Sequence, residues 1–344
     1  MLRALPHLGI PLPSGDTLTG IYFADDSTLL SYDLPSAVEQ LGVVQEFCDA
    51  SGARLNLPKC KTLVLNEHLD PADIDDGGLL RVLASGEPVK FLGVLFGHAL
   101  PPDHQVHQLN TRFLACFQQW GCRARTIQGR RLLVNTVMLS LLWHVTAVVP
   151  VPTAMVAQWQ SMVSKNILAR KTGSTDRYRP LLPQRWQYDP QVGLGVPHIA
   201  SKLRTQRLLR LQRLLQGTTA ASPPWQELVL RQYARTMGML SRPSHPFDFL
   251  AYAPHHRSTW LHLWELHPLW RDVWSHWAST SPSKRTQVPP SLATALAQPM
   301  WLTSDPLFVT DDLQCAGRLA NTLDARRWCL HGANNGIRCL GDLI

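Results

Sequence analysis

The chain has 344 residues, of which 45% are apolar and 17% are charged, and its 33 basic and 25 acidic side chains give a net charge of +8. This composition excludes the disordered class of low hydrophobicity and high charge, and at about 100–200 residues per domain the length indicates two or three domains. Residues 1–100 hold six basic and 13 acidic side chains, residues 101–240 hold 18 and four, and residues 241–344 hold nine and eight. The basic middle region predicts a polyanionic partner, either nucleic acid or an anionic membrane surface.

The seven cysteines have no paired spacing, and their odd number leaves no complete disulfide framework. A reducing, intracellular compartment, which includes the nucleus and the cytoplasm, is the simpler interpretation. The first 15 residues contain three prolines and no apolar core, so we expect no signal peptide there.

The first 100 residues have the pattern of an α+β domain. Apolar positions in residues 18–32 flank a polar tip with Asp25 and Asp26, which predicts a hairpin. Ser36 and Glu39 form a capping-box pattern, so a helix is expected from there to Gly52.

Further strands are expected in the same region. Residues 54–57 and 62–65 have strand-like composition, and residues 89–96 predict a strand pair around Gly93. Together with the hairpin and the helix, these strands complete the predicted α+β head.

From residue 103 the apolar pattern becomes helical. It predicts helices over residues 106–120, 132–149 and 156–167. Residues 132–149 lack Asp, Glu, Lys and Arg, but their five Asn, Ser, Thr and His side chains favour a buried core helix over a membrane span.

A basic helix is predicted over residues 202–215. Its Arg204 and Arg207 fall near the leucine face, and Arg210 and Arg213 fall opposite, so core packing and nucleic-acid binding remain equally open there. After a linker expected at residues 220–224, tryptophans recur at helical spacing between residues 260 and 277. This spacing favours core packing over a base-stacking platform.

Asp25 and Asp26 are the candidate chemical centre. Adjacent carboxylates repel each other, and a hard cation such as Mg²⁺ would hold them together with substrate phosphates. Two-metal phosphoryl transfer has this requirement. A solvated turn explains the pair equally well.

Three blocks, in this order, resemble the reverse transcriptases of non-LTR (LINE-type) retrotransposons. The blocks similar to palm motifs C, D and E are IYFADDSTLL at residues 21–30, SGARLNLPKCK at 51–61 and VKFLGV at 89–94. Weaker similarity continues through residues 129–150 and VGLGV at 192–196.

The resemblance implies an RNA-directed DNA polymerase, a nucleotidyltransferase of the retrotransposon class. Its architecture would be a partial reverse-transcriptase palm over residues 1–100, a basic helical thumb over 101–218 and a C-terminal helical region over 225–344.

The resemblance also implies residue roles. Asp25 and Asp26 match metal-binding carboxylates that hold Mg²⁺. Lys59, or alternatively Lys61, matches a lysine that gives a proton to the leaving pyrophosphate. Lys59 keeps the family's spacing from Asn56, but a solvated lysine fits the position as well.

Further positions match nucleic-acid contacts of the family. Tyr22 and Phe23 would brace the hairpin beneath the primer end, and a glycine in the primer grip lets backbone approach the primer phosphates. Basic thumb side chains would bind duplex phosphates without reading the sequence. The matching positions are, for the primer grip, Phe91, Leu92 and Gly93, and, for the thumb, Arg125, Arg130 and Arg131.

The family's motifs A and B are not found. Only 24 residues precede Asp25, and their sole acidic residue, Asp16, leads into the same hairpin. The sequence therefore predicts the C-terminal part of a polymerase that does not polymerise alone. The expected partners are an RNA template, an RNA–DNA or DNA duplex and the missing N-terminal part of the enzyme, with no membrane. The alternatives are a non-catalytic nucleic-acid-binding remnant and, less favoured, a membrane-surface protein.

Overall fold

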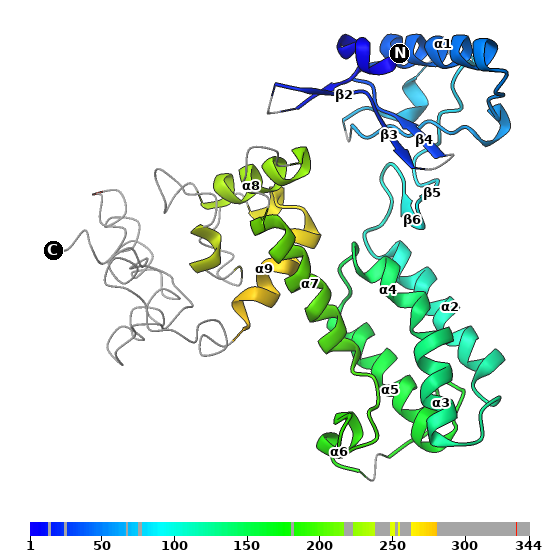
Figure 1. Ribbon diagram of the computed structural model, residues 1–344, viewed down its shortest axis with the longest axis vertical. Helices are drawn as coiled ribbons and strands as arrows, with labels where there is room; N and C mark the ends of the chain where they lie inside the picture. The colour runs from blue at the N-terminus through cyan, green and yellow to red at the C-terminus, as the bar shows by residue number, and fades with distance from the viewer. Residues whose placement is uncertain are drawn as a thin grey trace. The chain divides into compact units, whose positions relative to one another are not determined.

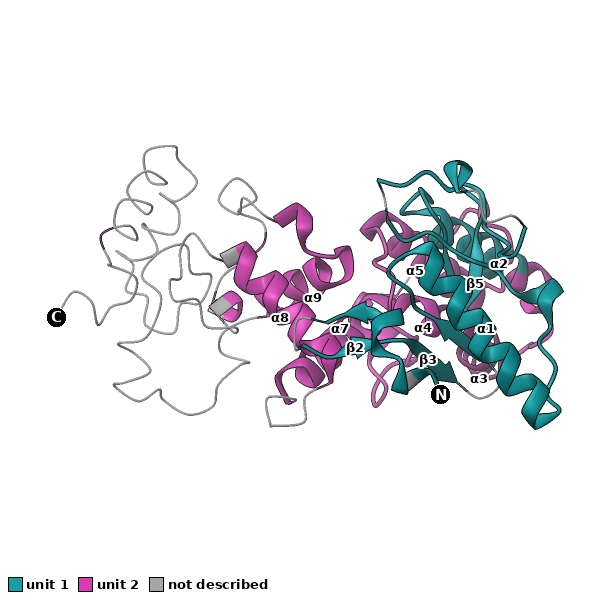
Figure 2. Ribbon diagram, turned by 90° about the horizontal axis from the view of Figure 1, so that it is seen from above, with its two compact units in different colours: residues 1–115 teal, residues 116–344 magenta. Residues whose placement is uncertain are grey.

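The chain forms two compact units, residues 1–115 and residues 116–344 (Figure 2). Their division falls inside helix α2 (His104–Trp120) and not at residue 100, where the sequence suggested a boundary. The computed structural model (Figure 1) describes residues 1–12, 15–23, 26–66, 68–74, 78–179, 182–216, 223–237, 248–251, 254, 263–280 and 335.

Unit 1 combines short strands with helix α1 (Leu34–Ser51), which confirms the α+β class. Its described strands form separate antiparallel pairs, so the palm that the resemblance implies is not confirmed. The pairs are β1 (Ile10–Pro11) with β2 (Thr17–Leu18), β3 (Gly20–Phe23) with β4 (Asp26–Leu29), and β5 (Val89–Phe91) with β6 (Val94–Phe96). Single 3₁₀ turns lie at Leu2–Ala4, Pro6–Leu8, Leu57–Lys59 and Pro71–Asp73.

Helix α1 is confirmed, but its expected cap is wrong. The helix begins two residues before Ser36, and the carboxylate of Asp33 accepts a hydrogen bond from the Ser36 amide at 2.9 Å. Hydrogen bonds from Ser36 lower the pKa of Asp33. Gly52 ends the helix at φ 73°, a left-handed conformation that suits glycine.

The strands expected at residues 54–57 and 62–65 are also wrong. Residues 54–57 lead into the 3₁₀ turn Leu57–Lys59, because Pro58 has a restricted φ and no amide hydrogen for a strand ladder. In the second segment, only Thr62 makes an isolated bridge, to Val82.

A buried glutamine joins the parts of unit 1. Gln40 on α1 donates to the carbonyl oxygens of Leu8 at 2.9 Å and Leu30 at 3.0 Å, and accepts from the Ser31 hydroxyl at 3.1 Å. Because Leu30 directly follows β4, Gln40 holds the β3–β4 hairpin against α1 and the N-terminal turn.

Unit 2 is helical, as the sequence predicts for this region. Its helices are α3 (Ile127–Leu133), α4 (Ser140–Thr146), α5 (Thr153–Ala169), α6 (Gln184–Tyr188), α7 (Ile199–Gln216), α8 (Pro224–Met237) and α9 (Pro268–Ala278), with 3₁₀ turns at Asp248–Ala251 and Leu263–Glu265.

The helix expected over residues 132–149 is interrupted by a π-helical turn, Val134–Met138, between α3 and α4. Val134, Met138 and Leu142 are fully buried, whereas Leu132 is 65% exposed, so the segment packs one face against the core. Among the described residues, no helix has both the length and the apolarity to cross a bilayer.

Helices α7, α8 and α9 share one core, although the sequence placed α7 and the other two in different domains. Tyr233 lies at its centre, stacked on Phe249 with ring centroids 3.8 Å apart, and donates to the carbonyl of Trp270 at 2.7 Å. Burial raises the pKa of Tyr233.

The tryptophans divide between core and surface. Trp270 and Trp274 are buried, in agreement with core packing, whereas Trp264 is 75% exposed. Trp260 and residues 220–222 of the expected linker lie outside the described residues.

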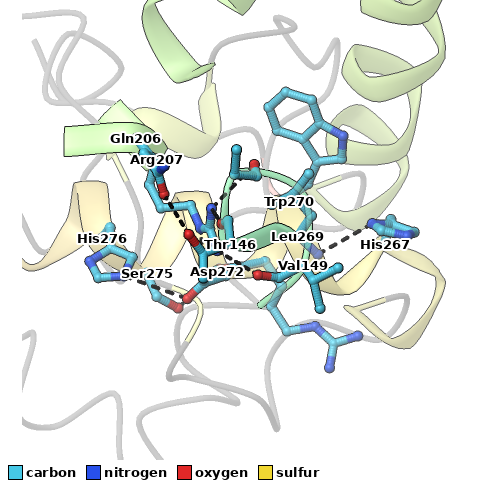
Figure 3. Close-up of polar contacts among 12 residues, drawn as sticks. Thr146, Val149, Gln206, Arg207, His267, Leu269, Trp270, Asp272, Ser275 and His276 are labelled. Carbon is cyan, nitrogen blue, oxygen red and sulfur yellow. Dashed lines mark hydrogen bonds and ion pairs between the residues drawn. The ribbon is translucent and has the colours of Figure 1, made fainter. Parts of the chain in front are cut away.

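Arg207 of α7 is a buried side chain with several polar contacts (Figure 3). It is 1% exposed, and its guanidinium binds Asp272 of α9 at 2.6 Å. It also donates to the carbonyls of Thr146, Ala147 and Val149, at 2.6, 3.3 and 3.0 Å. Arg207 therefore caps the end of α4 and joins it to α9, which settles its role as core packing.

We expect Arg207→Met to lower the free energy of unfolding by about 3–5 kcal/mol, because it removes the guanidinium from three carbonyls and from Asp272, which keeps only His276 at 3.6 Å among the described residues. Arg213→Met, at an exposed position of the same helix, is the control and should change stability by no more than about 0.5 kcal/mol. Urea denaturation measures both, and equal effects would contradict this role.

The second expectation concerns pH. Neutral His267 caps α9 by accepting at Nδ1 from the Leu269 amide at 3.2 Å (Figure 3). Burial, and then Arg271, lower the pKa of His267 in the folded state. The unfolded chain therefore binds more protons, and stability should fall as the pH decreases below about 6.5. His267→Asn keeps a capping group that does not titrate, so its unfolding free energy should fall less than that of the wild type; parallel pH curves would contradict this.

Candidate nucleic-acid interface

The predicted hairpin forms in unit 1. Phe23 pairs with Asp26 across the turn of β3 and β4, while Ala24 and Asp25 between them lie outside the described residues. Asp26 is exposed, and Tyr22 and Phe23 are 48% and 61% exposed. The end of the hairpin therefore presents two aromatic rings and a carboxylate to solvent.

The hairpin depends on a glycine. A side chain at Gly20 would place its Cβ 2.9 Å from the Tyr22 hydroxyl oxygen and 3.1 Å from the Thr28 carbonyl oxygen. The absence of a Cβ thus leaves room for Tyr22 to lie back along the sheet.

The magnesium site stays a prediction. Asp26 is the described member of the carboxylate pair, and among the described residues no group of three or more His, Cys, Asp or Glu side chains is arranged to hold a metal. Asp25 and Asp26 are the residues that would bind the cation, through the carboxylate oxygens that Mg²⁺ prefers.

The two candidate lysines differ in their surroundings. Lys61 lies 3.7 Å from a carboxylate oxygen of Glu87. Lys59 is exposed at the end of its 3₁₀ turn, and in the described part of the chain it forms no ion pair, with Asp26 or any other carboxylate. Lys59 is therefore the lysine whose charge is open to a phosphate ligand.

Of the expected primer-grip residues, Phe91 ends β5, and Leu92 and Gly93 form the two-residue turn between β5 and β6. Leu92 and Gly93 both have positive φ, 46° and 85°, as in a type I′ turn, where Asn-Gly is preferred and leucine is strained. Buried Gln105 of α2 accepts from the Leu95 amide at 3.2 Å and donates to the Gly93 carbonyl at 3.4 Å. Phe91 packs edge-on against Phe96. The turn is held rigidly, and Leu92 is 39% exposed on it.

The three predicted thumb arginines, all in unit 2, have different environments. Arg125 and Arg131 are exposed. Arg130 is only 7% exposed and donates to the carbonyls of Ile167 and Arg125, both at 2.7 Å. Burial and the nearby Arg170 lower its pKa. Arg130 thus joins α3 to α5 inside the unit, which differs from the expected surface contact with phosphate.

Around Arg130 the ends of α2, α3 and α5 meet. Arg170 follows α5 with φ 56° and donates to the Cys122 carbonyl at 2.9 Å. Buried Asn166 donates to the carbonyls of Gly121 at 3.2 Å and Lys171 at 3.0 Å. These contacts bring four exposed cations together in what we call the basic corner: Arg123, Arg125, Arg170 and Lys171.

The basic corner is poor in carboxylates, and Asp176 binds the amide of Thr172, which follows Lys171. Residues 104–200 hold 11 basic and two acidic side chains, Asp176 and Asp189. Both carboxylates accept hydrogen bonds from backbone amides of their own loops. Within the described ranges, none of the four corner cations forms an ion pair.

Sequence reasoning did not single out Arg123, Arg170 and Lys171. Arg170 and Lys171 are about 45 residues from Arg125 along the chain, and only the packing of α3 on α5 brings them near it. For Arg123 the sequence contains a local signal, because Trp120 stands three residues earlier. In the structure the guanidinium carbon of Arg123 lies 5.4 Å from the centroid of that ring.

Comparisons with protein-family models, with curated proteins and with solved structures found no match.

The strained turn gives a stability prediction. Leu92→Asn should raise the free energy of unfolding by about 1 kcal/mol, because asparagine tolerates positive φ. The control is Leu79→Asn, since Leu79 is also an exposed leucine, at 63%, but has no positive φ. Denaturation of both variants checks this, and an equal response would mean that Leu92 stores no strain.

Proposed function

We propose that this chain binds nucleic-acid duplexes, with an RNA–DNA hybrid as the preferred class, as a reverse-transcriptase-type protein similar to those of non-LTR retrotransposons. The observation that carries the binding proposal is the basic corner, which gathers four exposed cations that form no ion pair in the described part of the chain. The choice of an RNA–DNA hybrid comes from the three motif blocks in unit 1.

We expect the basic corner to bind the phosphates of a nucleic acid and not the edges of its bases. The side chains of Arg130, Asn166 and Arg170 donate hydrogen bonds to main-chain carbonyls and so hold the loops that carry the cations. Lysine and arginine bound to phosphates release condensed counterions, which makes the affinity depend on salt and not on sequence. Four phosphate contacts would give a slope of about −3.6 for log K against log salt, at about −0.9 per contact.

Unit 1 supports the polymerase-type part of the proposal. Its hairpin end presents Phe23 and Asp26, and its rigid turn presents Leu92. These features belong to the blocks that resemble motifs C and E. Magnesium-dependent nucleotide addition is the second candidate function, and extension of a primed RNA template that is lost on Asp25→Ala would favour it over binding alone.

For the binding proposal, we expect the double variant Arg125→Ala/Lys171→Ala to weaken hybrid binding and to make the salt slope shallower by about two. The measurement is fluorescence anisotropy with a labelled RNA–DNA hybrid at several salt concentrations, on the full chain.

The matched control is Arg112→Ala/Arg213→Ala, which removes the same charge from exposed positions outside the corner. If both double variants lower the slope equally, the attraction comes from net charge and not from the corner. A wild-type affinity that does not change with salt would overturn the proposal.

A further inference from the structure

Helix α6 and the loop after it form a tight substructure in unit 2, at the VGLGV block (Figure 1). The loop turns back on the helix through three backbone hydrogen bonds: Leu194 to Trp186 at 2.8 Å, Val196 to Gln187 at 2.8 Å and Gly195 to Asp189 at 3.1 Å, each from amide to carbonyl. We call residues 184–196 the α6 loop.

Two residues make this loop rigid. The Asp189 carboxylate accepts from the amides of Gln191 at 2.8 Å and Val192 at 3.0 Å, and these bonds lower its pKa. At Gly193, an added Cβ would lie 2.5 Å from the carbonyl oxygen of Trp186. The close backbone contact therefore requires glycine, and it holds the backbone of Trp186 in place.

On this fixed backbone, an aromatic ring and two cations are exposed together. Trp186 is 46% exposed, and the guanidinium carbon of exposed Arg185 lies 5.9 Å from its ring centroid. Exposed Arg131, from α3, donates to the Leu194 carbonyl at 3.3 Å. A Cβ at Gly195 would lie 2.8 Å from this guanidinium, so glycine leaves room for Arg131 against the loop.

A second basic segment precedes the α6 loop in the chain. Burial, and then the neighbouring Tyr188, raise the pKa of Tyr178. Tyr178 is flanked by exposed Arg177 and Arg179. The half-exposed Trp186 thus has Arg185 at its ring and Arg131 on the same loop, and neither cation is paired with a carboxylate among the described residues.

We propose that the α6 loop binds single-stranded nucleic acid, with an unpaired base stacked on Trp186 and the adjoining phosphates on Arg185 and Arg131. This inference rests on the proposed duplex binding and adds the strand that extends from the duplex. The exposed indole ring favours a single strand over a duplex as the ligand, because bases inside a duplex are stacked on each other and offer no face to a side chain. An indole ring is not needed for phosphate contacts alone.

The test compares two hybrids of equal duplex length, one blunt and one with an eight-nucleotide single-stranded extension. We expect the wild type to bind the extended hybrid about tenfold more tightly, the size of one base–aromatic stack. Trp186→Ala should remove most of this gain and leave the affinity for the blunt hybrid unchanged. Trp264→Ala, at a 75% exposed tryptophan outside the loop, is the matched control and should keep the gain.

A third ligand separates stacking from charge. An extension of the same length made of abasic nucleotides keeps the phosphates and removes the bases, so with wild-type protein it should lose most of the gain and keep only the part that comes from Arg185 and Arg131. Trp186→Phe keeps an aromatic ring and should retain part of the gain. An unchanged gain in Trp186→Ala, or an equal gain from the abasic extension, would overturn the inference. Failure of the wild type to bind the blunt hybrid would instead contradict the proposed duplex binding.

Discussion

The buried guanidinium of Arg207 is the interaction on which the helical unit depends. A charge that is 1% exposed is stable only when every donor has an acceptor, and here the acceptors come from the end of α4 and from Asp272 of α9. The hydrogen bonds of this one arginine thus join α7 to α4 and to α9, which are each about 60 residues away along the chain. The aromatic core around Tyr233 forms beside this junction.

The same physics divides the basic residues into two groups. Arg130 and Arg207 donate inside the protein to carbonyls that helix ends leave without partners, whereas the cations of the basic corner and the α6 loop remain at the surface. The net charge of a sequence segment does not distinguish the buried arginines from the surface cations. The buried arginines are what bring the surface cations together, since Arg130 joins α3 to α5 between Arg125 and Arg170.

In unit 1, local patterns predicted local structure well. The β3–β4 hairpin, helix α1 and the turn at Gly93 form where alternation, helical spacing and glycine placed them. Residues 54–57 and 62–65 have strand-like side chains, but Pro58 and the lack of a neighbouring ladder leave them without extended pairing, apart from the bridge at Thr62. A strand forms only where the fold places a neighbouring strand for its main-chain hydrogen bonds.

The sequence by itself determined the α+β class of the first unit and the helical character of the second, because both follow from side-chain periodicity. Only the tertiary structure decided which arginines are buried and which positions join in one corner. Arg130 and Arg131 are neighbours in α3, yet Arg130 is buried, whereas Arg131 is exposed and donates to the α6 loop. Periodicity gives the direction of a side chain on its own helix, whereas its exposure depends on the helix that packs against it.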